Sequence, residues 1–244
     1  MMQFQKPPAL ATGLPIFMLI LFVSVSTKKL ENFALAAGKL SPPLQFLNRL
    51  TLYPLFHHHI ILLILNCLSL FPLLSLYEAE HGTVRTGIVL NVLAVFTGFV
   101  YVVIATIFES QSFAFGASGW VYAFMANLAW VQYTKVPNLP VKNIPIKAIA
   151  SREIPTWTWP IAVLIVGDLI FPYSSFLGHA IGLGFGYLLG MGKLDFALTP
   201  TCHVVALIES KIEPAIVGLN KIVHWYKEVD IRPADGGHIL GHVN

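Results

Sequence analysis

Long apolar runs separated by short polar segments dominate the chain. Residues 7–27 carry no charged side chain. At about 1.5 Å of helical rise per residue, a run of this length spans the roughly 30 Å hydrocarbon core of a membrane. Further runs of comparable length follow at residues 50–77, 86–108 and 113–134. The pattern therefore predicts a bundle of membrane-spanning helices.

The apolar stretch from residue 154 to residue 192 is too long for one span. Its strongly polar positions are Asp168 and His179, and the segment Pro172-Tyr173-Ser174-Ser175 lies between them. Proline and serine are typical turn residues, so we predict a fifth and a sixth span on either side of this segment. The basic residues of the loop 135–153 favour the cytosol for this side of the bundle and hence for both termini.

Two features leave room for other interpretations of the topology. The first apolar run is an alternative candidate for a cleaved signal peptide, but it is long for one and only Lys6 precedes it as a basic residue. We therefore interpret it as a retained span. The loop after this span carries four basic residues, Lys28, Lys29, Lys39 and Arg49, which favour the opposite orientation of the bundle.

Composition supports a membrane protein. Of 244 residues, 56% are hydrophobic and 11% are charged, whereas soluble domains usually have about 25% charged residues. The net charge of +3 comes from scattered Lys and Arg, which gives no indication of nucleic-acid binding. Cys67 lies in an apolar run and Cys202 near the C-terminus, so we predict no disulfide framework.

The segment 193–244 has a different character from the rest of the chain. Apolar residues recur at helical spacing up to Tyr226, with charged residues on the other faces, as in amphipathic helices that lie on a membrane or dock on a protein. We expect a break near Pro214 and disorder at residues 230–244, which are rich in glycine. The predicted organisation is a six-span domain at 1–192 followed by a cytosolic tail at 193–244.

Polar side chains within the predicted spans are the candidates for chemistry, because each is costly in hydrocarbon. They are His57, His58, His59, Asn66, Asn91, Ser118, Asn127, Asp168 and His179. For any one of them, a hydrogen bond between helices explains its presence as well as a function does. Two such residues at the same depth are more informative than either alone.

Ser118 and His179 form such a pair. Each lies near the start of a span that runs inward, at about 24 Å and about 20 Å from its inner end by helical rise. Small residues at four-residue spacing predict that the two spans are neighbours. These residues are Gly119 and Ala123 on the fourth span and Gly182, Gly186 and Gly190 on the sixth. His179 shares the face of the glycines, and a serine beside a neutral imidazole is the minimal activated nucleophile.

These residues resemble those of the rhomboid intramembrane serine proteases. The motifs are Gly-Ala-Ser-Gly at 116–119 followed by Tyr122, and His179 with Gly182 and Gly186 two spans later. The similarity covers approximately residues 10–192, and the polar segments are most similar to the fungal Golgi-type rhomboids. It implies an all-α, six-transmembrane-helix bundle.

The resemblance also implies roles for individual residues. Ser118 would be the nucleophile and His179 its general base, and Tyr122 would stack on the imidazole ring. The oxyanion of the tetrahedral intermediate would be stabilised by the Ser118 backbone N–H and by the Asn66 side chain, a donor of a kind typically worth about 3 kcal/mol. Gly116 would keep the approach to the nucleophile open.

One position departs from the family pattern. The family commonly has a histidine four residues before the asparagine, where this chain has Leu62. The family's earlier histidine, nine residues before the asparagine, is present as His57, which we count among the supporting residues. His58 and His59 are expected to face water. A metal site in this histidine run is an alternative, but no carboxylate or cysteine accompanies it at ligand spacing, so we predict neither a metal nor a cofactor.

Two polar residues are assigned structural roles. Asp168 lies four residues before Pro172, near the outer end of the fifth span. We expect it to serve interfacial hydration or a helix cap rather than to act as a third catalytic residue. Asn127 lies more than two helical turns inward of Ser118 and is expected to form a hydrogen bond between helices.

The sequence therefore predicts an intramembrane serine protease that cleaves single-span membrane proteins, admitted from the lipid bilayer between the second and fifth spans. The resemblance implies a Golgi membrane, with the endoplasmic reticulum and endosomes as alternatives. One rival function is an inactive rhomboid-like factor that binds membrane proteins for quality control, which Leu62 favours. Another is a small transporter, which the lack of carboxylates in the first four spans disfavours. No partner of the tail is predicted.

Overall fold

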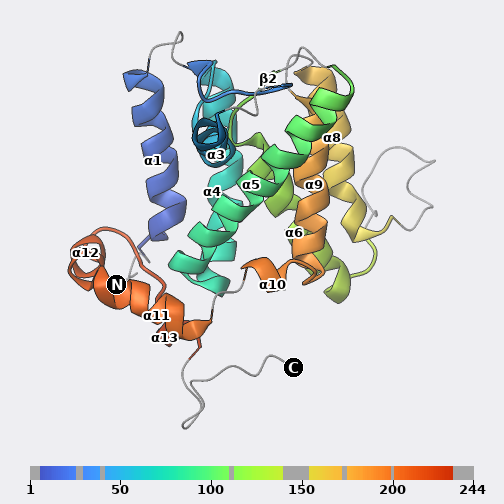
Figure 1. The fold of residues 1–244 in the computed structure, drawn as a ribbon. Coiled ribbons are helices and arrows are strands. Elements are labelled where there is room, and N and C mark those ends of the chain that lie inside the picture. The colour runs from blue at the N-terminus through green and yellow to red at the C-terminus, as the bar shows by residue number, and fades with distance from the viewer. Residues whose placement is uncertain are drawn as a thin grey trace.

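The computed structural model describes residues 6–25, 30–38, 42–109, 113–139, 154–171, 175–198 and 201–232. Helices dominate these residues, as the sequence predicts. Six helices form the bundle (Figure 1): α1 (Ala9–Ser24), α4 (Ile60–His81), α5 (Thr83–Ile107), α6 (Ser118–Lys135), α8 (Trp159–Ile170) and α9 (Phe176–Gly190). Most of the predicted basic loop, the turn at 172–174 and the end of the tail at 233–244 lie outside the described residues.

Within the described part of the chain, α4 and α5 are long and apolar enough to cross a membrane by length and composition. Three further segments are apolar but shorter. They are α1, the continuous segment formed by the short 3-10 helix η2 (Thr156–Thr158) and α8, and α9. Each of the six apolar segments of the sequence thus contributes a helix to the bundle, and two of these helices, α4 and α5, combine the length and the apolar composition of an independent span.

The second apolar run differs from the prediction. Residues 50–77 do not form one helix, because Pro54 lies in the 3-10 helix η1 (Tyr53–Leu55) and the backbone is extended at His59 before α4 begins. Ahead of η1, the short helix α3 (Pro43–Leu52) lies beside α5, toward the end of the bundle where α1 ends (Figure 1). The interruption places His57 outside the helix that carries Asn66.

A two-stranded ribbon lies above α5 in the same region of the bundle (Figure 1). The strands β1 (Leu35–Ala36) and β2 (Phe113–Ala114) pair antiparallel, with Leu35 opposite Ala114. Because β2 immediately precedes the turn into α6, this pairing fixes the chain just before the start of that helix. The polar end of the bundle that holds Ser118 is therefore covered by extended chain and by α3.

The helices α6 and α9 are in backbone contact, which confirms the prediction made from the small residues. A methyl group on Gly182 would lie 2.5 Å from the Gly119 carbonyl oxygen. A methyl group on Gly186 would overlap the carbonyl oxygen of Ala123. Only glycine allows this approach, and the approach brings the N-terminal turns of the two helices together.

The described part of the tail contains four short helices, α10 (Asp195–Leu198), α11 (Cys202–Lys211), α12 (Glu213–Leu219) and α13 (Glu228–Ile231). The predicted break near Pro214 is confirmed, since α11 ends at Lys211 and Pro214 occupies the first turn of α12. Of the two placements left open for the amphipathic region, docking on the bundle is observed. The helices α11 and α13 contact α5 and α4, at the end where the chain begins (Figure 1).

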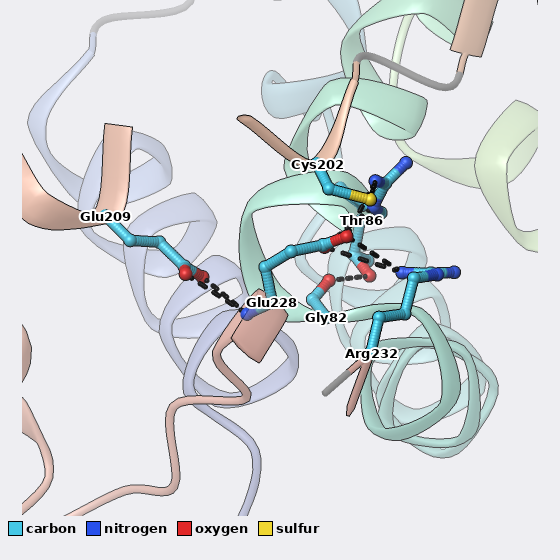
Figure 2. A network of polar contacts seen from close by, with 7 residues as sticks. Gly82, Thr86, Cys202, Glu209, Glu228 and Arg232 are labelled. Atoms are coloured by element: carbon cyan, nitrogen blue, oxygen red, sulfur yellow. Dashed lines mark hydrogen bonds and ion pairs between the residues drawn. The ribbon is translucent and has the colours of Figure 1, made fainter. Parts of the chain in front are cut away.

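A buried ion-pair network holds the tail in place (Figure 2). The Arg85 guanidinium of α5 donates to both carboxylate oxygens of Glu228, at 2.8 Å and 2.7 Å, and Glu228 is only 3% exposed. The Glu209 carboxylate accepts the Glu228 backbone N–H, and Arg232 adds a second cation to Glu228. Burial raises the pKa of Glu228, but the hydrogen bonds and charge of Arg85 outweigh it and hold that pKa below its usual value.

A second buried carboxylate joins α1 to the same corner of the molecule. Glu78, near the end of α4, is fully buried and accepts the backbone N–H groups of Leu10 and Ala11 at 2.9 Å and 2.8 Å. It thereby satisfies donors that the first turn of α1 leaves without an intrahelical partner. The Ala9 backbone N–H donates to the carbonyl oxygen of His224 in the tail, at 2.9 Å.

Candidate active site

The turn into α6 depends on a glycine. Gly116 has a φ of +87°, a conformation that side chains other than glycine rarely adopt. A methyl group there would lie 3.2 Å from the His57 ring and 3.5 Å from the Asn66 amide nitrogen. Gly116 therefore directs the chain into Ala117 and Ser118 and also leaves room for two polar side chains of the preceding elements.

Ser118 is the first residue of α6, and His179 lies in the first turns of α9. The Ser118 Oγ and the His179 Nε2 are 2.8 Å apart, and the imidazole is only 6% exposed. The Ser175 hydroxyl accepts the Gly178 backbone N–H and so caps the helix that carries the histidine. With the imidazole proton on Nδ1, Nε2 accepts the serine hydroxyl proton, which is the arrangement of a nucleophile with its general base.

The ring of Tyr122, one turn after Ser118, packs against the imidazole. The two ring centroids are 4.8 Å apart, with an angle of 36° between the planes. Tyr122 is in turn covered by α8, where a methyl group on Gly167 would lie 2.7 Å from the tyrosine hydroxyl oxygen. The His179 imidazole is thus held between the Tyr122 ring and α9, the helix that carries it.

His57 lies at the same site, although it belongs to the segment before α4. Asn66 Nδ2 donates to His57 Nε2 at 2.9 Å, and the Ala117 backbone N–H points at the same nitrogen at 3.3 Å. His57 is 4% exposed, whereas its neighbours His58 and His59 are exposed. The structure therefore brings His57, Asn66 and the start of α6 together.

A small cavity of about 20 Å³ lies beside Ser118 and His179, lined also by Thr97, Tyr101 and Ser175. A cavity of this size holds about one water molecule. Asn127 lies away from the pair, beside Gly190 near the other end of α6 and α9, as its position in the sequence indicates. In the described ranges, no group of three or more His, Cys, Asp or Glu residues is placed to hold a metal ion.

Asp168, for which the sequence favours a structural role, also lies near the pair. Its Oδ1 atom is 3.9 Å from His179 Nδ1. The interpretation of Asp168 as an interfacial or capping residue stays a prediction, and it does not include this proximity to His179. One feature of the sequence could have indicated this proximity: Asp168 is the only carboxylate between residues 154 and 192, the stretch that also contains His179.

A serine hydroxyl in contact with a buried imidazole, inside a bundle of apolar helices, defines a serine hydrolase of the membrane. The comparisons with known proteins agree with this class. A family model described as the Rhomboid domain matches residues 45–196.

Curated relatives match nearly the whole chain. Rhomboid-type serine protease 2 of Yarrowia lipolytica is 34% identical, over 97% of this chain and 82% of its own length. The protein of the same name from Eremothecium gossypii is 37% identical over 93% of this chain and 84% of its own length, and that of Saccharomyces cerevisiae is 32% identical over 92% and 84%. The chain therefore belongs to the rhomboid family, and it is an integral membrane protein with the activity of an intramembrane serine protease.

Proposed function

We propose that this protease cleaves transmembrane segments of single-span membrane proteins with a Ser118–His179 dyad. The observation that carries the proposal is the 2.8 Å contact between the Ser118 hydroxyl and the buried His179 imidazole. In this mechanism Nε2 takes the hydroxyl proton as Oγ attacks the peptide carbonyl, and the proton then passes to the leaving amine. In the second step His179 takes a proton from a water molecule as its oxygen attacks the acyl carbonyl, and the proton passes to Ser118 Oγ as the acyl bond breaks and the carboxylic acid leaves.

The oxyanion site in this proposal consists of the Ser118 backbone N–H and the Asn66 side chain. Ser118 is the first residue of α6, and the first N–H groups of a helix have no intrahelical partner, so this donor is available to a substrate. The contact of Asn66 with His57 supports a positioning role for His57, because it fixes the direction in which the amide points. The role would offset the lack of a histidine at Leu62.

A test of His57 follows from this geometry. His57→Ala is expected to slow the reaction of Ser118 with a fluorophosphonate probe about tenfold, the effect of one net hydrogen bond. His58→Ala is the matched control, since the His58 side chain, next to His57 in the sequence, is exposed and contacts the Phe115 ring instead of the Asn66 amide. Equal rates for the two variants would show that His57 does not orient Asn66 for the reaction.

The membrane arrangement belongs to the same proposal. Residues 1–192 form a six-span protease domain, the N-terminus and the tail at 193–244 lie in the cytosol, and the enzyme resides in the Golgi membrane. Docking of the tail at the end of the bundle where the chain begins supports a common side for both. The substrate helix enters from the bilayer between α4 and α8, whose exposed apolar side chains are suited to contact with lipid.

Labelling of the purified protein by a fluorophosphonate probe tests the dyad. We expect the wild-type protein to react, Ser118→Ala to give no labelling, and His179→Ala to react more than about a thousandfold more slowly. The melting temperature of each variant shows whether it is folded. A folded wild-type protein that does not react would contradict the proposal and favour a rhomboid-like factor that binds membrane proteins without cutting them.

A further inference from the structure

The two nitrogens of the candidate base have different surroundings. His179 Nε2 faces Ser118, but His179 Nδ1 is buried and has no hydrogen-bond partner among the residues that the structure describes. A neutral imidazole that accepts the serine proton on Nε2 carries its own proton on Nδ1. Leaving such a buried donor unsatisfied costs about 1–3 kcal/mol. The site therefore requires an acceptor near Nδ1.

The Asp168 carboxylate is placed to be that acceptor. Its Oδ1 atom lies 3.9 Å from Nδ1, and its side chain is 27% exposed while that of His179 is 8% exposed. The distance is about 1 Å longer than a hydrogen bond. A change of this size in the Asp168 side chain, or in the position of α8, closes the gap.

The packing of α8 is compatible with such a change. Its buried residues are Pro160 and Leu164, both in the first half of the helix. In the second half, which carries Asp168, Gly167 lies against the Tyr122 hydroxyl group, whereas Ile165, Val166, Leu169 and Ile170 are exposed. The half of α8 that bears the carboxylate is thus less buried than the half before it.

We infer that Asp168 is a positioning residue that orients the His179 imidazole by accepting a hydrogen bond from its Nδ1–H. The inference rests on the proposed roles of Ser118 and His179. It adds a third member, supplied by α8, to what the family resemblance implies is a dyad. The helix α8 also borders the proposed entry path for substrate. The position of α8 and the orientation of the His179 imidazole are therefore coupled through the Asp168 side chain.

The carboxylate takes no proton in this scheme. As Oγ forms its bond to the substrate carbonyl carbon, the hydroxyl proton passes to Nε2, and the imidazole becomes an imidazolium. Asp168 remains ionised and stabilises this cation through the Nδ1–H hydrogen bond. When the amine leaves, it takes the proton from Nε2 and the imidazole is neutral again. The bonds and charges therefore balance without a further reactant.

The test measures fluorophosphonate labelling of the full-length protein at several probe concentrations, which separates the maximal rate from half-saturation. Asp168→Ala and Asp168→Asn are expected to lower the maximal rate about 10- to 100-fold, the range for a hydrogen bond to a charged group. Half-saturation and the melting temperature are expected to remain those of the wild type. Asp168→Glu is expected to recover part of the rate, because it restores a carboxylate.

Glu80→Gln is the matched control, since Glu80 is an exposed carboxylate at the opposite end of α4 from the site. Wild-type rates for Asp168→Ala and Asp168→Asn would overturn the inference. A lower melting temperature, or a change confined to half-saturation, would also overturn it in favour of a structural role. Failure of the proposed function is recognised separately, because the wild-type protein would then not react or Ser118→Ala still would.

Discussion

Replacing Gly186 by valine is expected to destabilise the protein and to slow labelling of Ser118 by at least about a hundredfold. The added side chain would overlap the Ala123 carbonyl oxygen, which belongs to the backbone of α6 and cannot turn aside. The two helices must then separate. Overpacking of this kind typically costs about 1–3 kcal/mol or more, and a displacement of about 1 Å between reacting groups lowers rates by about a hundredfold.

The same helix provides the control for this variant. Gly184 lies two residues away on another face, where an added methyl group would meet nothing within 4 Å. Gly184→Val therefore changes helix propensity by a similar amount but leaves the contact with α6 intact. Melting temperature and labelling rate are measured for both variants. If Gly186→Val behaves like Gly184→Val, the backbone contact between α6 and α9 does not hold Ser118 and His179 together.

The second large effect is expected at the tail. Glu228→Leu leaves the Arg85 guanidinium buried without its carboxylate, and breaking a buried ion pair from one side costs about 3–5 kcal/mol. The backbone amides of α11 and α13 are therefore expected to exchange hydrogen for deuterium at least about a hundredfold faster than in the wild type. Labelling of Ser118 is expected to change far less, because Ser118 begins α6, whereas Arg85 and Arg232 lie near Val131 at the other end of that helix.

Two further variants sharpen this experiment. Glu213→Gln removes an exposed partner of Lys227, and such surface pairs contribute about 0–1 kcal/mol, so exchange should hardly change. The double variant Arg85→Met with Glu228→Leu removes both buried charges and is expected to regain much of the protection. Equal exchange in Glu228→Leu and Glu213→Gln would mean that the Arg85–Glu228 pair does not hold the tail.

The proximity of Ser118 and His179 could be predicted from the sequence. The rise of a helix is constant, so the distances of Ser118 and His179 from the ends of their spans could be compared without coordinates. The recurrence of small residues at Gly182 and Gly186 then identified the contacting face. Both arguments use only regular helical geometry, and the described structure keeps that geometry in α6 and α9.

Other parts of the site depend on irregular or distant chain. His57 precedes an extended segment, so counting nine helical residues back from Asn66 places it too far from the site. Asp168 lies near the C-terminal end of α8 and His179 near the N-terminal end of α9, but periodicity does not show which face of α8 meets α9. The contact of Arg85 with Glu228 joins residues 143 positions apart, and no local pattern indicates it.

The contacts that hold the start of α1 come from segments of the chain that are synthesised at different times. Glu78 holds the first turn of α1, and His224 completes the same corner by pairing with Ala9. At about 5–20 residues per second, the ribosome needs on the order of tens of seconds to synthesise the intervening chain. During that interval the Ala9 backbone N–H at the start of α1 lacks this acceptor. The hydrogen bond between Ala9 and His224 therefore forms only after residue 224 has been synthesised, long after α1.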